Sequence, residues 1–394
     1  MEKVPYNQRL AAMKPSASLV LMSRAKEMQK KDPSVIGLAG GEPDFPTPDR
    51  ICMEAVRQMA NGFTHYAIGP GIPELRQRIA RKLQEENDIL CSAEDIIVTP
   101  GGKYAIYIAM NALLNEGDEV IILDPAWVSY EPITLAAGAL PVHVHLNWKD
   151  HYQIHRDALE AVVTNRTRML IINYPNNPTG RCLSRQEADE LEQFLLAHPN
   201  VLLLSDEIYE RLRYDGCENI SMGSYPSISS RVITVNGFSK CAAMTGWRLG
   251  YLAAAKEYFN PIYKLCQHSI SCVSGFVQKA GVVALDCTEE MDAMCRIYHQ
   301  RRNLFAAKLN EIPGVHCELP QGAFYAWVTY DINGMTSEQI CEYLLENAGV
   351  VGMPGTAYGE EAIASMRFSF ANATEDMSRA GDRIKDALLR LQKN

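Results

Sequence analysis

Five short apolar runs recur through the middle of the chain, and each is followed by a proline, a glycine or a polar pair. They are Ile96–Val98, Val120–Leu123, Met169–Asn173, Val201–Ser205 and Val232–Val235. Runs of this length and composition are typical of buried strands. Stretches with helical periodicity, such as Arg185–Ala197, separate them. The alternation predicts an α/β fold in which a mostly parallel central sheet is covered by helices on both faces.

The pattern changes in the last quarter of the chain. A long charged helix is expected over Glu290–Glu311, a strand over Gly322–Val328 and an amphipathic helix from Thr374. This mixture predicts a smaller α+β domain beside the large one. The expected division is an N-terminal arm (1–45) that packs with the small domain, a large domain (46–289) and a small C-terminal domain (290–394).

Composition narrows the class of protein. The chain has 394 residues, of which 47% are apolar, so it can bury a large core in two lobes. Its net charge is −9 and it has no basic tract, which argues against a nucleic acid partner. No apolar run reaches membrane-spanning length and the N-terminus lacks a cleavable apolar core. The eleven cysteines have no metal-type spacing and indicate reduced thiols, so we expect a cytoplasmic protein.

The most informative segment is Asn236–Gly250, which follows the last of the five runs. It contains Lys240 and, eight residues later, Arg248. An amine at a strand end can form a Schiff base with an aldehyde, and a guanidinium can hold a phosphate with two parallel hydrogen bonds. Together they suggest pyridoxal 5'-phosphate, which needs both groups.

Groups suited to the same cofactor follow other strands. The carboxylate of Asp206 could pair with the ring nitrogen and keep it protonated, which makes the ring a better electron sink. Tyr209 and Asn177 are suited to hydrogen-bond the phenolic oxygen of the ring. Gly101 and Gly102 would let the backbone approach a phosphate at the start of a helix.

With these motifs in this order, the chain resembles the class I aminotransferases, the aspartate aminotransferase-like branch of fold-type I pyridoxal phosphate enzymes. The resemblance extends from Met13-Lys-Pro-Ser16 to Met366-Arg-Phe-Ser369. It implies that Lys240 carries the cofactor, Arg248 binds its phosphate, Asp206 contacts the ring nitrogen, Tyr209 and Asn177 contact the phenolic oxygen, and Trp127 stacks on the ring. It also gives Gly101, Gly102 and Lys103 the phosphate-loop position, and makes Arg367 and Gly41 the residues that meet the substrate α-carboxylate.

The resemblance also implies a homodimer, because Tyr66 matches a tyrosine that reaches the phosphate of the neighbouring subunit. One position departs from the pattern: many relatives have serine three residues before the lysine, where this chain has Gly237. A hydroxyl contact to the phosphate would then fall to Ser239.

The amino acid substrate is harder to predict. One branch of the family binds the distal carboxylate of dicarboxylic substrates with an arginine a few dozen residues after the phosphate arginine, but this chain has none between Arg248 and Arg296. A bacterial branch with Met-Lys-Pro-Ser-Ala near its start uses other groups. Here Lys103, helped by Ser16 or Ser18, would take that role, unless Lys103 only adds charge to the phosphate loop. We therefore expect aspartate or glutamate with a 2-oxo acid, and aromatic amino acids or prephenate as the alternative.

Two other functions are weighed against this one. The same fold supports β-elimination by lyases, which the cofactor motifs do not distinguish from transamination. A transcription regulator with an aminotransferase-like sensor domain would need a DNA-binding domain ahead of the first motif, where only a short arm is expected.

Two local expectations complete the prediction. Asn177-Pro178 and Asp124-Pro125 are expected to be cis peptides, because relatives bend sharply there. The histidines at 143, 145, 151 and 155 could share a face, but no cysteine or paired carboxylate completes a metal site, and Pro141–Leu146 alternates like an edge strand. No metal is therefore expected.

Overall fold

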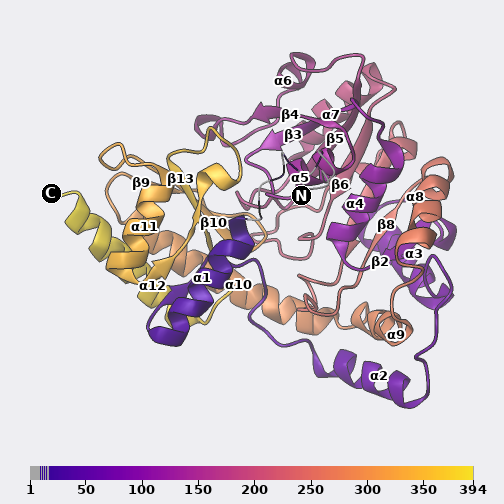
Figure 1. The fold of residues 1–394 in the computed structure, drawn as a ribbon, viewed down its shortest axis with the longest axis horizontal. Helices are drawn as coiled ribbons and strands as arrows, with labels where there is room; N and C mark the ends of the chain where they lie inside the picture. The colour runs from indigo at the N-terminus through magenta and orange to yellow at the C-terminus, as the bar shows by residue number, and fades with distance from the viewer. Residues whose placement is uncertain (1–8, 10, 12, 14, 16, 394) are drawn as a thin grey trace, which may run out of the picture.

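The computed structural model describes residues 9, 11, 13, 15 and 17–393. It is an α/β protein in which a large sheet and a smaller sheet lie side by side (Figure 1). The large sheet has seven strands in the order β2-β8-β7-β6-β5-β3-β4. Their bounds are β2 Ile96–Thr99, β3 Glu119–Asp124, β4 Leu140–His145, β5 Thr167–Asn173, β6 Leu202–Asp206, β7 Val232–Gly237 and β8 Gly250–Ala253.

All strands of this sheet are parallel except β8, which is antiparallel to both β2 and β7. Strands β3, β6 and β7 are buried along their whole length. Helices cover both faces, so these strands are continuous apolar runs and do not alternate. The expected edge strand is confirmed, since β4 lies at the end of the sheet and has exposed residues.

Two apolar layers hold the helices against the large sheet. Ile122, Ile171 and Leu204 pack with residues of α4, α5 and α8 on one face. Their strand neighbours, such as Leu123 and Leu203, point the other way and pack against α7. The helices of this lobe are α2 Asp49–Ala60, α3 Pro73–Asn87, α4 Gly102–Leu113, α5 Tyr130–Ala136, α6 Arg156–Glu160, α7 Arg185–Ala197, α8 Lys256–Ser269 and α9 Gly275–Ala284.

Helix α7 has the bounds expected from the sequence. Ser184 starts it with a capping box, in which the Ser184 hydroxyl accepts a hydrogen bond from the Glu187 backbone N–H. The Glu187 carboxylate in turn accepts one from the Ser184 backbone N–H at 3.0 Å. This reciprocal pair satisfies N–H groups that a helix start would leave unbonded.

The smaller lobe is built on a four-stranded antiparallel sheet in the order β12-β13-β10-β9. Its strands are β9 Val315–Cys317, β10 Tyr325–Tyr330, β12 Met353–Pro354 and β13 Ser365–Ser369, and its helices are α10 Thr288–Asn310, α11 Ser337–Ala348 and α12 Thr374–Leu391. Helix α10 runs from the large lobe into the small one (Figure 1). Strand β10 begins at Tyr325 and not at Gly322, because Ala323 has a positive φ of 56° that interrupts extended backbone.

The N-terminal segment meets the small lobe. Helix α1 (Ala17–Lys31) precedes β1 (Ile36–Gly37), which pairs in parallel with β11 (Val350–Val351). The bounds of the three expected domains stay a prediction. Within the described part of the chain, no helix is long and apolar enough to cross a membrane.

Candidate active site

The parallel strands β5, β6 and β7 end at one edge of the large sheet, and the last residues of β5 and β6 line a single cavity. Asn173 ends β5, Asp206 ends β6 and Gly237 ends β7. The carboxyl ends of an open α/β sheet are where ligands bind. The cavity has a volume of about 380 Å³, within the range of small-molecule sites. Its lining includes Gly41, Gly102, Lys103, Trp127, Asn177, Asp206, Tyr209, Ser239, Lys240, Arg248, Tyr325 and Arg367.

Asp206 is a buried carboxylate at the base of this cavity. One of its oxygens accepts a hydrogen bond from the Tyr130 hydroxyl at 2.7 Å, and the other accepts one from the backbone N–H of Ile208 at 3.3 Å. Burial raises the pKa of Asp206 to about 6, while the Tyr130 hydrogen bond lowers it. A buried carboxylate with so few partners is suited to pair with a cationic group of a ligand.

Lys240 lies in the same cavity, and its amine donates a hydrogen bond to the Gly41 carbonyl. Burial lowers the pKa of Lys240 to about 8; Glu42 and Asp206 oppose this shift, whereas Arg367 and Arg248 add to it. A lysine with a pKa near neutrality is deprotonated often enough to act as a nucleophile or a general base.

Arg248 and the start of α4 form a corner of the cavity that is suited to bind an anion. Gly101, with a φ of 84°, precedes the helix, and a Cβ atom there would lie 2.6 Å from Nη2 of Arg248. The guanidinium therefore passes directly over the first turn, where backbone N–H groups have no partner within the helix. Ser239 lines the same cavity and is buried.

Close packing explains why position 237 is a glycine and not the serine expected from relatives. A Cβ atom on Gly237 would lie 2.9 Å from the Cα of Gly250 on the neighbouring strand β8. Gly250 itself lies against Gly101 and Gly102, since its Cβ would come within 2.6 Å of Gly102 N. Strands β7 and β8 and the backbone of Gly101 and Gly102 are packed too closely here for a side chain.

Arg367 forms the opposite end of the cavity, on β13. Its guanidinium donates to Asn177 Oδ1 at 2.9 Å and to the Ala39 carbonyl at 2.7 Å. Its Nε is buried without a hydrogen-bond partner in the described part of the chain. An arginine held in place with an unsatisfied N–H group is suited to bind a carboxylate. Met366 and Phe368, which flank Arg367 on β13, belong to the apolar core.

Trp127 and Lys103 lie together at the side of the cavity. The Lys103 amine is 5.0 Å from the centre of the Trp127 ring, a cation–π distance. Burial lowers the pKa of Lys103, and Arg248 lowers it further. Lys103 is thus near both the anion corner and the ring of Trp127, and either role expected for it stays a prediction.

Most of the residues expected from the sequence line this one cavity. Gly101 does not, although its neighbour Gly102 does. Tyr66 is 91% exposed and is not among the lining residues. Ser16 lies outside the described residues. Ser18 falls within α1, but its side chain is likewise outside what the structure describes.

Tyr325 and Tyr130 are site residues that the sequence did not reveal. The Tyr325 hydroxyl is 2.7 Å from that of Tyr209, and its ring lies under the guanidinium of Arg367, 4.2 Å from the ring centre to Cζ. Tyr130 supports Asp206 from helix α5. Tyr325 lies inside an apolar run and Tyr130 lies between Ser129 and Glu131, so no local pattern marks either tyrosine as a site residue.

One expected cis peptide is wrong. Asp124-Pro125 is cis as expected, but the second cis bond is Tyr174-Pro175 and not Asn177-Pro178. Pro178 lies inside a turn closed by the Gly180 N–H, which donates to the Asn176 carbonyl at 2.9 Å. The fixed φ of a trans proline suits such a helical turn.

The histidines and Cys241 have ordinary partners. His143 Nδ1 is 2.8 Å from Asp124 Oδ2, which raises the pKa of His143, and His155 pairs with Asp150. No group of three potential ligands that could hold a metal occurs among residues 9, 11, 13, 15 and 17–393. Cys241 is a packing residue: its thiol donates to the Gly237 carbonyl, and burial raises its pKa to about 11.

In sequence and in fold, this chain is similar to known aminotransferases. The model of the family "Aminotransferase class I and II" matches residues 33–384. An aspartate aminotransferase of Musicola paradisiaca is 42% identical over 95% of this chain and 94% of its own length. Aromatic-amino-acid aminotransferase 2 of Thermococcus litoralis is 36% identical over 97% of this chain and 98% of its own. The solved aspartate aminotransferase from Thermus thermophilus with maleate has a TM-score of 0.90 at 34% identity, and the match covers 98% of this chain and 100% of that one.

Proposed function

Because this chain belongs to the class I and II aminotransferase family, we propose that it uses pyridoxal 5'-phosphate to move an amino group between an amino acid and a 2-oxo acid. The observation that carries this proposal is the placement of Lys240, Asp206 and Arg248 around one cavity, with Arg367 at its far end. These four groups match an aldehyde, a ring nitrogen, a phosphate and a substrate carboxylate in turn.

The residues fit that cofactor on structural grounds. The Arg248 guanidinium lies so close to Gly101 that a side chain at position 101 would collide with it. Because glycine has no side chain, a phosphate bound there could contact the backbone N–H groups of the helix start and the guanidinium together. Asp206 would hold the ring nitrogen, Trp127 would stack on the ring, and Tyr209 and Asn177 would bond its phenolic oxygen. When bound, the cofactor supplies a conjugated ring that delocalises the electron pair left on the substrate α-carbon.

Lys240 performs the proton transfers. With its pKa lowered to about 8 by burial, a substantial fraction of the amine is neutral near physiological pH. It would take the proton from the substrate α-carbon and deliver a proton to a carbon of the bound cofactor, acting first as general base and then as general acid. The reaction then runs in two halves, amino donor first and 2-oxo acid second, which gives ping-pong kinetics.

Arg367 and Asn177 orient the substrate. The unsatisfied Nε of Arg367 is a donor for the α-carboxylate, and the Asn177 amide holds the guanidinium in place. Gly41 lies beside this end, where its carbonyl accepts a hydrogen bond from Lys240. Together these contacts would bring the α-carbon to the lysine amine.

Aspartate or glutamate is the proposed amino donor. The arginine that one branch of the family uses for the distal carboxylate is missing, since no arginine lies between Arg248 and Arg296. Lys103, at the side of the cavity, is a cation that could bind this carboxylate instead. The Thermus thermophilus structure contains maleate, a dicarboxylate, which supports this choice by analogy. Aromatic amino acids or prephenate are the second candidate, supported by similarity to the Thermococcus litoralis enzyme and to a probable aspartate/prephenate aminotransferase of Aquifex aeolicus.

The proposed assembly is a homodimer in which Tyr66 reaches the partner's phosphate. Tyr66 is 91% exposed in a single chain, and the nearby Ile68 is also exposed. Helix α2 adds exposed apolar side chains at Met53, Val56 and Met59. An apolar surface of this kind is typical of an interface between subunits. A cytoplasmic location stays a prediction.

A panel of amino donors tests the function. The purified protein is saturated with pyridoxal 5'-phosphate, and each donor is followed by the loss of cofactor absorbance and by formation of its 2-oxo acid. Stoichiometric exchange supports transamination, whereas release of pyruvate and ammonia from donors with a β-leaving group would identify a lyase. Lys240→Ala should abolish exchange and still fold, and near-normal turnover in that variant would refute the site.

A further inference from the structure

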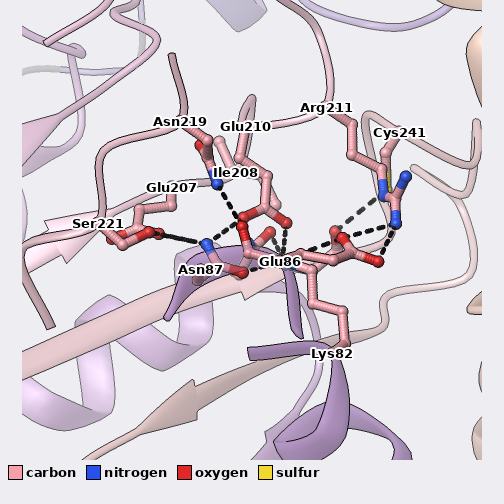
Figure 2. A network of polar contacts seen from close by, with 12 residues as sticks. Lys82, Glu86, Asn87, Glu207, Ile208, Glu210, Arg211, Asn219, Ser221 and Cys241 are labelled. Carbon is pink, nitrogen blue, oxygen red and sulfur yellow. Dashed lines mark hydrogen bonds and ion pairs between the residues drawn. The ribbon is translucent and has the colours of Figure 1, made fainter. Parts of the chain in front are cut away.

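A buried polar network lies directly behind the residues expected to contact the cofactor. Figure 2 shows Lys82 and Asn87, from the last turns of α3, meeting Glu207, Glu210 and Ser221. All five residues are at most 7% exposed. None of them lines the active-site cavity.

Asn87 is the centre of this network. Its amide Nδ2 lies 3.1 Å from Glu207 Oε2 and 2.7 Å from both Glu210 Oε2 and Ser221 Oγ. Its carbonyl oxygen accepts a hydrogen bond from the Lys82 amine at 2.7 Å. A single side chain therefore joins both carboxylates to the one buried lysine of the network.

Both carboxylates are held from several sides. Glu207 accepts hydrogen bonds from Ser205 at 2.9 Å and from Ser221 at 2.6 Å, and Glu210 forms an ion pair with Lys82. Burial raises the pKa of Glu207 to about 7. Burial alone would also raise the pKa of Glu210, but Lys82 and Asn87 hold it below its ordinary value. Lys82 also lies 4.0 Å from Glu86, which forms an ion pair with Arg211, and hydrogen bonds from Ser205 and Ser221 hold Glu207.

Residues of the active site and residues of the network alternate along the short segment 206–210. Asp206 and Tyr209 face the cavity, whereas Glu207 and Glu210 point to α3. After Asp206 the chain leaves β6 and forms a turn, closed by the Glu210 N–H to the Glu207 carbonyl at 3.0 Å. The Glu207 N–H bonds to the Val235 carbonyl of β7 at 2.9 Å, and beyond that bond the side chains of Glu207 and Glu210 tie the turn to α3.

A network of this kind is a costly way to stabilise a fold. Removing two carboxylates and an ammonium from water carries a desolvation penalty that apolar packing avoids. Such groups are retained where they fix one geometry. Here the network would fix the orientation of the Asp206 and Tyr209 side chains toward the cavity.

We propose that Asn87 and Lys82 are positioning residues, which hold Glu207 and Glu210 from the end of α3 and so fix Asp206 and Tyr209 against the cofactor ring. This inference rests on the proposed function, because it concerns the residues assigned to the ring. It goes beyond that function in giving α3 a role in the reaction, although no residue of α3 lines the cavity.

The test compares Asn87→Leu with a matched change on the same helix. Arg81→Met is the control, since Arg81 forms an exposed pair with Glu85 and faces away from the network. Three quantities are measured for each: the Tm of the cofactor-free protein, the pH midpoint of the visible absorbance of bound pyridoxal 5'-phosphate, and kcat and KM for aspartate. We expect Asn87→Leu to shift the absorbance midpoint and to lower kcat about 10–100-fold with a smaller change in KM, as displaced reacting groups do. Arg81→Met should change neither the absorbance midpoint nor kcat.

A milder variant covers the case in which Asn87→Leu does not fold. Ser221→Ala removes one hydroxyl that contacts Glu207, and it should shift the midpoint in the same direction by a smaller amount. A folded variant of either kind with a lowered Tm but native midpoint and kcat would mean that the network only stabilises the fold. A native protein that does not bind the cofactor would instead contradict the proposed function.

Discussion

The hydroxyl groups of Tyr209 and Tyr325 lie 2.7 Å apart, and this contact joins the two lobes inside the active site. Tyr209 follows β6 of the large sheet, whereas Tyr325 begins β10 of the small sheet. The ring of Tyr325 also lies against Arg367, 4.2 Å from the ring centre to Cζ. Tyr209, proposed to meet the phenolic oxygen of the cofactor, is therefore coupled through Tyr325 to Arg367, proposed to meet the substrate carboxylate.

Tyr325→Phe should separate these two contacts. The hydrogen bond to Tyr209 is lost, at a cost of about 0.5–1.5 kcal/mol, but the ring beneath Arg367 remains. We expect kcat to fall up to about tenfold with little change in KM for the amino acid. Tyr330→Phe, on the same strand, is the control and should behave as the native protein does. An unchanged kcat in Tyr325→Phe would show that the contact between the lobes has no part in the reaction.

Lys103→Ala tests the substrate preference. If Lys103 meets the distal carboxylate, kcat/KM for aspartate should fall about 10–100-fold, since a hydrogen bond to a charged group contributes about 1.5–3 kcal/mol. Phenylalanine has no distal charge, so its kcat/KM should fall much less. Equal losses for both donors would assign Lys103 to the phosphate, and the dicarboxylate preference would lose its support.

Asp206→Asn should alter how stability depends on pH. The pKa of Asp206 is about 6 in the folded protein, against an ordinary value of 3.8, so between these values the folded state binds more protons than the unfolded state. The contribution of Asp206 to the free energy of unfolding is therefore largest below about pH 4, and it is lost as the pH rises through 6. The cofactor-free variant should gain up to about 3 kcal/mol relative to the native protein between pH 4 and 7. Urea unfolding at several pH values measures this, and parallel curves for the two proteins would contradict it.

Mixing two defective variants tests the shared site. Lys240→Ala and Tyr66→Ala subunits should each have little activity alone. If Tyr66 serves the partner's phosphate, a mixed dimer contains one site with both native residues, and activity returns when the variants are refolded together. Light scattering should give a dimeric mass for the native protein. A fully active monomer, or no recovery on mixing, would refute the composite site.

The sequence by itself determined the fold class and predicted most of the residues that the structure brings together around one cavity. Continuous apolar runs ending in Asp206 and before Lys240 reveal buried parallel strands and the polar groups at their ends, because burial on both faces removes alternation. Helix α7 was predictable to the residue, since its start is encoded locally by Ser184 and Glu187. Such features depend on neighbours a few positions apart.

The tertiary structure alone decided which distant side chains meet. Tyr325 reaches Tyr209 across 116 positions, and Asn87 reaches Glu207 across 120, so no local pattern could reveal either pair. The second cis bond was misplaced for the same reason. The choice between Pro175 and Pro178 depends on the closed turn at Asn176–Gly180 and on Gly322, which packs against Pro175. Contacts of this kind arise only when the two lobes and the end of α3 are packed together, because their energy comes from groups that the chain brings together on folding.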